Sequence, residues 1–137
     1  MPYSIDWYIE SEIIYIHYSG ATTVDELRES LIATKNMIDS SDRHLVHMIA
    51  DVGDVTEATS IKDSLQVVRE VGAHDRTGWQ ITLREKSIVV KMGAAFGTTL
   101  FKIRARTFDT MDETVAFLKT QDETLSWNKI NTSLRIP

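Results

Sequence analysis

The stretch IADVGDVTEATSIKDSL, residues 49–65, joins an apolar run to the start of an amphipathic pattern. Apolar residues over 44–52 indicate a short strand, and apolar spacings of three and four indicate a helix over 60–71. Thr59 and Ser60 stand where that helix begins, and a hydroxyl side chain in this position accepts a hydrogen bond from a free amide of the first turn. The stretch therefore predicts a strand, a loop and a capped helix in succession.

Strand-like and helix-like patterns continue on both sides of this unit. β-Branched and aromatic residues predict four further strands, at 3–9, 12–18, 78–83 and 102–108. Helical spacing and two capping boxes, Thr23 with Glu26 and Thr110 with Glu113, predict further helices at 23–39, 87–100 and 111–124. Two strands followed by strands and helices in alternation predict an α/β protein: a mixed five-stranded sheet, opened by a β-hairpin, with about four helices.

The composition indicates one compact unit and excludes several classes of protein. The 137 residues fit one domain, which we place at residues 1–125, with an aperiodic tail at 126–137. The absence of cysteine excludes disulfides, and a net charge of -5 argues against a nucleic-acid-binding protein. No apolar run approaches the roughly 20 residues of a membrane-spanning helix. Because no leader pattern is evident, we expect a cytoplasmic protein, and no motif calls for a cofactor.

The element order, with Asp51 placed between a strand and a capped helix, resembles the STAS domains of anti-sigma-factor antagonists, in particular the SpoIIAA-like group. In that family an Asp ends the third strand, and an Asp-Ser pair opens the next helix and carries the phosphorylated Ser. Aligned without gaps, Asp51, Thr59 and Ser60 fall on these positions. Thr59 replaces the second acidic residue, and Ile61 and Lys62 replace a small hydroxyl residue and a Gly.

The resemblance implies a SpoIIAA-like fold and a protein partner such as an anti-sigma-factor-like kinase. We therefore expect a regulatory or protein-interaction domain without enzymatic activity, whose contact surface is the loop and helix start at residues 54–62. The candidate contact or phosphorylation residues are Asp51, Asp54, Thr59, Ser60 and Lys62. Two interpretations of the hydroxyl groups stay open. They serve only as a helix cap, or they receive a phosphate that meets the free amides and the positive end of the helix dipole.

An alternative function is that of a carrier for a small apolar ligand or lipid. Small residues over 91–97 leave room beside a helix, and four large side chains are candidates to line a pocket there. These side chains are Met48, Trp79, Met92 and Phe96. Core packing accounts for the same residues without a ligand, so both interpretations remain.

Neither a metal site nor a catalytic constellation is expected. His44 and His47 lie three residues apart in a predicted strand, and such residues point to opposite faces of a sheet. No nucleophile motif of the GxSxG type is present. The oligomeric state stays open, with a homodimer as one alternative.

Overall fold

The structure is a computed structural model that describes residues 3–86 and 104–137. Its strands are β1 (Tyr3–Ile9), β2 (Ile13–Ala21), β3 (Val46–Glu57), β4 (Thr77–Leu83) and β5 (Ala105–Phe108). Its α-helices are α1 (Val24–Ser40), α2 (Ile61–Val71) and α4 (Met111–Gln121), followed by the 3₁₀ turn Trp127–Lys129. The described residues thus contain three of the four α-helices that the sequence predicts. The fourth, at 87–100, lies outside the described residues.

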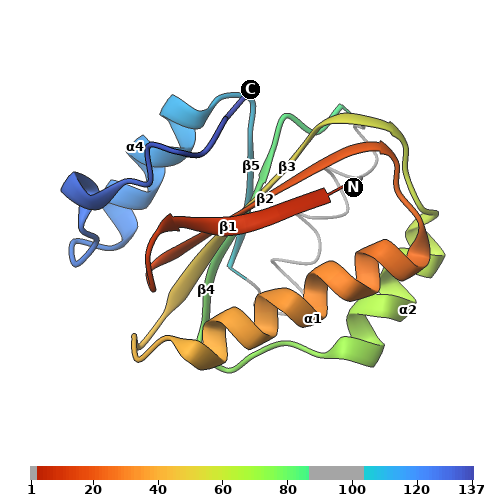
Figure 1. Ribbon diagram of the computed structural model, residues 1–137, viewed down its shortest axis with the longest axis horizontal. Helices are drawn as coiled ribbons and strands as arrows, with labels where there is room; N and C mark the ends of the chain where they lie inside the picture. Colours follow the sequence, from red (N-terminus) through yellow and green to blue (C-terminus); the bar gives the residue numbers. More distant parts are fainter. Residues whose placement is uncertain (1–2, 87–103) are drawn as a thin grey trace.

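The five strands form one sheet in the order β1-β2-β3-β4-β5 (Figure 1). β1 pairs with β2 antiparallel, and the pairs β2–β3, β3–β4 and β4–β5 are parallel. The predicted mixed sheet with an opening hairpin is therefore confirmed. One predicted boundary is wrong, because β3 does not end near Asp51 but continues to Glu57. The extension follows from β2, which pairs with β3 as far as Ala21 opposite Glu57.

The helix starts agree with the capping residues seen in the sequence. Thr23, Ser60 and Thr110 are the N-caps of α1, α2 and α4, and each side chain accepts a hydrogen bond from the backbone amide three residues further on. Such a cap satisfies one of the amides that a helix start leaves free. α2 ends at Gly72, which has a positive φ of 75°. Glycine adopts such a value without strain because it has no Cβ.

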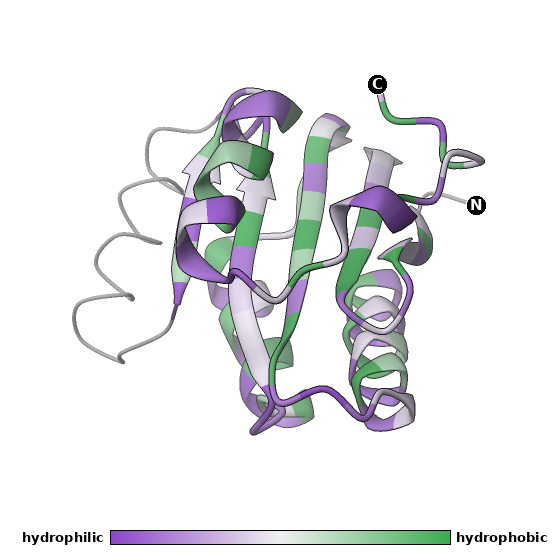
Figure 2. Ribbon diagram, turned by 90° about the vertical axis from the view of Figure 1, so that its left-hand side faces the viewer, coloured by the Kyte–Doolittle hydropathy of each residue, from purple (hydrophilic) through white to green (hydrophobic). Residues whose placement is uncertain are grey.

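The sheet separates two apolar layers. Hydrophobic residues are green in Figure 2. Because successive residues of a strand point to opposite faces and the first four residues of β2 are all buried, this strand contributes to both layers. On one side β2 packs against α1 through residues such as Ile14, Ile16 and Ile38. On the other side Ile13, Ile49 and Leu118 belong to a cluster that includes α4. Figure 1 shows α1 and α2 on the first side and α4 with the C-terminal segment on the second.

Residues 126–137 pack against the α4 side of the sheet. Ile130 forms an antiparallel bridge with Ile9 at the end of β1, and the amide of Asn131 donates to the Tyr8 carbonyl at 2.8 Å. Trp127, Ile130, Leu134 and Ile136 rest on the same apolar cluster. The division of the chain into a domain at residues 1–125 and a tail at residues 126–137 stays a prediction. Within the described residues, no helix has the length and apolar character needed to cross a membrane.

Candidate functional site

The start of α2 presents hydroxyl groups at the surface. The Ser60 hydroxyl accepts a hydrogen bond from the Asp63 amide at 3.1 Å, and Ser60 is exposed. Thr59 is half-buried, and its hydroxyl lies 2.6 Å from the hydroxyl of Ser64. Lys62 is exposed in the first turn. The predicted cap is therefore present, and Ser60 is more exposed to solvent than Thr59.

The outward side of α2 is apolar for a surface helix. Val67 is its only fully buried residue. Ile61, Leu65 and Val68 are 52%, 52% and 50% exposed, and their spacing of four and three residues aligns them along one stripe. A stripe of this kind next to a capped helix start is a typical contact surface for another protein. We call these three residues the α2 stripe.

Charged side chains border the α2 stripe unequally. Lys62 and Arg69 follow Ile61 and Val68 on the exposed side of the helix. Neither forms an ion pair with another residue in the described part of the chain. Glu70, one residue after Arg69, is neutralised by Arg28 of α1, with the Arg28 Nε 3.0 Å from its carboxylate. The exposed first turn also holds Asp63, so the stripe lies beside two cations and one carboxylate that form no ion pair within the described part of the chain.

Asp51 lies within β3, whereas the resemblance to the STAS family placed it at the end of a strand. Its side chain is fully buried, and it accepts hydrogen bonds from the Tyr15 hydroxyl at 2.8 Å, the Gly53 amide at 3.1 Å and Arg84 Nε at 2.9 Å. These donors come from β2, β3 and the residue after β4. Burial, and then the hydrogen bond and charge of Asp51, raise the pKa of the Tyr15 phenol above its ordinary value. Asp51 is thus a structural carboxylate that a partner does not reach.

Asp54 extends this network to the surface. Its carboxylate lies 2.7 Å from His17 Nε2 and 3.2 Å from the Arg84 guanidinium. Hydrogen bonds from His17, then from Arg84, lower the pKa of Asp54. The guanidinium lies so close to Gly53 that a Cβ there would overlap with it. Asp54 is therefore accessible but engaged by two internal partners.

Two of the four residues proposed for an apolar pocket, Met48 and Trp79, lie within the described part of the chain. Met48 and Trp79 lie on opposite faces of the sheet: Met48 packs on the α1 side, and Trp79 on the α4 side. There the Trp79 ring meets Phe117 edge-on at 4.8 Å, with the Arg106 guanidinium 5.3 Å from the Trp79 ring centre. Met92 and Phe96 lie outside the described residues. A groove of about 680 Å³ does exist on the Met48 side, between the sheet and the two helices, and Leu27, Leu31, Val52 and Val68 contribute to its lining.

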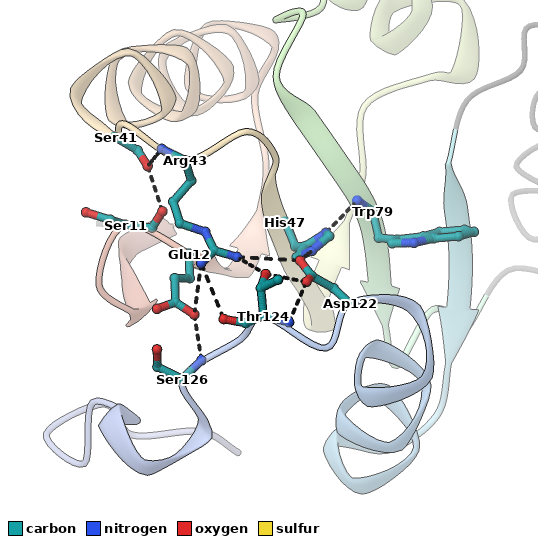
Figure 3. Close-up of polar contacts among 9 residues, drawn as sticks. All are labelled: Ser11, Glu12, Ser41, Arg43, His47, Trp79, Asp122, Thr124 and Ser126. Carbon is teal, nitrogen blue, oxygen red and sulfur yellow. Dashed lines mark hydrogen bonds and ion pairs between the residues drawn. The ribbon is translucent and has the colours of Figure 1, made fainter.

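A buried polar cluster at the opposite end of β3 was missed by sequence reasoning (Figure 3). His47 is 1% exposed, and its Nε2 lies 2.8 Å from the carboxylate of Asp122, just after α4. Arg43 hydrogen-bonds to the side chain of Thr124, and Glu12 accepts from the amide of Ser126 at 2.7 Å. No local pattern signals this cluster, because the partners are 75 or more residues apart.

Neither the network around Asp51 and Asp54 nor the cluster around His47 provides an evident catalytic or metal site. Both ring nitrogens of His47 are engaged by internal partners, Asp122 and the Trp79 amide, so the imidazole has no free atom to act as a base. Across residues 3–86 and 104–137, no group of three or more His, Asp or Glu side chains is arranged to hold a metal ion.

Comparison with solved structures identifies a similar fold. The chain is similar to the anti-sigma factor antagonist SpoIIAA in its unphosphorylated form, with a TM-score of 0.55 and 14% sequence identity over 88% of this chain and 99% of that chain. At this identity the likeness concerns the fold, and the predicted SpoIIAA-like α/β fold is confirmed. No protein-family model and no curated protein matches the sequence.

Proposed function

We propose that this protein is a regulatory interaction domain that binds another protein through the start and the outward side of α2. The observation that carries the proposal is the α2 stripe, three large apolar side chains that are half exposed on one helix next to the accessible Ser60. Isolated exposed apolar residues are ordinary, but three in register form a surface whose burial favours association. The similar fold of an anti-sigma factor antagonist supports a role of this class.

The partner that suits this surface presents an apolar groove with acidic residues along one side. Lys62 and Arg69, together with the positive end of the α2 dipole, attract negative charge. Two copies of α2 packed on each other about a two-fold axis would bring the same cations together, which opposes self-association through this stripe. A different protein is therefore the better partner.

Phosphorylation of Ser60 is the regulatory step that we propose for this surface. A phosphate adds about -1.5 to -2 charges at neutral pH, and the free amides of a helix start accommodate it. Because Ser60 is exposed, the modified residue remains compatible with the fold. The new charge cancels the positive border of the α2 stripe and weakens binding of an acidic partner. An anti-sigma-factor-like kinase is the proposed source of the phosphate.

Affinity capture with matched variants tests the binding surface. Leu65→Glu places a charge in the centre of the α2 stripe and should abolish capture of the partner. Ile32→Glu is the matched control, because Ile32 is an apolar residue of α1 with a similar exposure of 45%. The proposal is wrong if both variants, or neither, lose the partner while their circular dichroism spectra match that of the wild type.

The regulatory step has a test of its own. Tandem mass spectrometry of the protein isolated from its native cells should locate a phosphate on Ser60. Ser60→Asp and Ser60→Asn both retain an N-cap, but only the first adds charge. We expect Ser60→Asp to weaken partner capture and Ser60→Asn to preserve it. An unmodified Ser60 together with equal capture by the two variants would exclude the switch and leave the binding surface untouched.

The alternative of an apolar-ligand carrier has less support. Met48 and Trp79, the two described residues of the predicted pocket, are separated by the sheet. We therefore do not extend the proposal to a ligand.

A further inference from the structure

The imidazole of His47 takes the place of one rung in the parallel ladder between β3 and β4. Val46 pairs with Thr77 and Met48 pairs with Gln80, so two residues of β4, Gly78 and Trp79, lie opposite the single residue His47. An irregularity of this kind leaves a backbone group without its ladder partner. Here the Trp79 amide donates to His47 Nδ1 at 2.9 Å.

Gly78 makes this substitution possible. A Cβ at position 78 would overlap with Nδ1 and its neighbouring ring atoms. The absence of a side chain therefore lets the ring enter the space between the two strands. The bulge, the glycine and the imidazole form one joint at the amino end of β4.

The hydrogen bonds of the ring determine its protonation state. Because Nδ1 accepts from the Trp79 amide, it carries no hydrogen. Nε2 then carries the hydrogen of the neutral ring and donates it to the Asp122 carboxylate at 2.8 Å (Figure 3). A second proton has only Nδ1 to bind, where it would point at another N–H group.

The charges around the ring come from every element packed against it. Asp122 follows α4 and favours a positive ring, whereas Arg43, before β3, and Arg104, before β5, oppose it. Glu12, in the hairpin turn, lies 4.0 Å from Arg43 and offsets part of its charge. Burial is the largest influence and lowers the pKa of His47. Hydrogen bonds from Thr124 and His47 outweigh burial at Asp122 and lower the pKa of that carboxyl.

We propose that His47 is a proton-sensitive joint that ties β4 to β3 and to the chain after α4 at neutral pH and releases the amino end of β4 on acidification. The added proton converts the bond to the Trp79 amide into a repulsion between two N–H groups. The imidazolium then leaves the bulge for solvent, where burial no longer lowers its pKa. The change concerns the end of the sheet opposite the α2 stripe and is independent of the proposed partner.

The direction of the pH effect follows from proton binding. His47 has a lowered pKa in the closed joint and an ordinary one of about 6.5 when the joint is open. Below about pH 6.5 the open form therefore binds more protons, and the opening equilibrium rises by up to about tenfold per pH unit until the closed form is also protonated. Above that pH the opening equilibrium is constant.

Nuclear magnetic resonance of the intact protein tests the two parts of this proposal. With ¹⁵N-labelled histidine at neutral pH, Nε2 of His47 should carry the hydrogen and Nδ1 should not. Amide exchange should show the protection of Trp79, relative to that of Ile81 on the same strand, falling between about pH 7 and about pH 5 by up to about tenfold per pH unit. A hydrogen on Nδ1, or a constant ratio, would overturn the proposal.

Matched variants separate proton binding from packing. In His47→Gln the carboxamide presents an acceptor to Trp79 and a donor to Asp122 but does not titrate, so the ratio of protections should stay constant across this pH range. His44→Gln is the control, because His44 is exposed and three residues away. It should retain the wild-type pH response. A response that persists in a folded His47→Gln protein would assign the effect to another group and refute the proposal.

Discussion

Replacing Asp51 with alanine tests whether one buried carboxylate holds three strands together. The substitution leaves the Tyr15 hydroxyl and the Gly53 amide without their acceptor, and each unsatisfied buried group costs about 1–3 kcal/mol. Arg84 is partly exposed, so water and Asp54 compensate for most of its lost interaction. We therefore expect the free energy of unfolding to fall by about 3–5 kcal/mol, a large part of the roughly 5–15 kcal/mol of a typical domain.

Urea unfolding followed by tryptophan fluorescence measures this loss. Asp51→Asn retains the shape and one acceptor oxygen, so its loss should lie between those of the wild type and the alanine variant. Asp54→Ala is the control, because it removes a surface carboxylate that binds the same Arg84 guanidinium, and its effect should be much smaller. Equal losses in Asp51→Ala and Asp54→Ala, or an unchanged urea midpoint in the former, would refute the reasoning.

Three further predictions concern single positions. Gly78→Ala inserts a methyl group against the His47 ring, and thermal unfolding should show a loss of about 1–3 kcal/mol. Ser60→Ala removes the N-cap of α2 and should cost about 1 kcal/mol, seen as faster amide exchange at Asp63, with Ser60→Asn restoring the protection. The raised pKa of the Tyr15 phenol contributes stability below its ordinary pKa of about 10 that is lost as the pH rises further, so Tyr15→Phe should flatten the alkaline decline in chemical unfolding.

Local patterns account for the elements that the sequence predicts well. The starts of α1, α2 and α4 follow from Thr23, Ser60 and Thr110, because a hydroxyl side chain satisfies a free amide within its own first turn. The end of β3 was predicted too early. Residues 53–57 resemble a loop in composition and become a strand only because β2 supplies hydrogen-bond partners for them.

The face on which a strand residue lies was harder to predict. Met48 and Trp79 were proposed as neighbours in a pocket, but the bulge opposite His47 brings Met48 into register with Gln80 instead. Because alternate residues of a strand point to opposite faces, this register sends Trp79 to the α4 side. At these positions the sequence offers one residue that is typical of a bulge, Gly78. Because a glycine in a strand also occurs at tight bends and at close approaches of another backbone, it does not by itself predict the bulge.

The sequence by itself determined the order of the elements, the caps that begin the helices and the position of Ser60 at a helix start. These properties depend on residues within one or two turns of each other. Only the tertiary structure decided that Asp51 is buried against Arg84, that His47 meets Asp122 and that the α2 stripe remains exposed. Those outcomes depend on strand register and on which helix covers which face, and both are set by the packing of segments far apart in the chain.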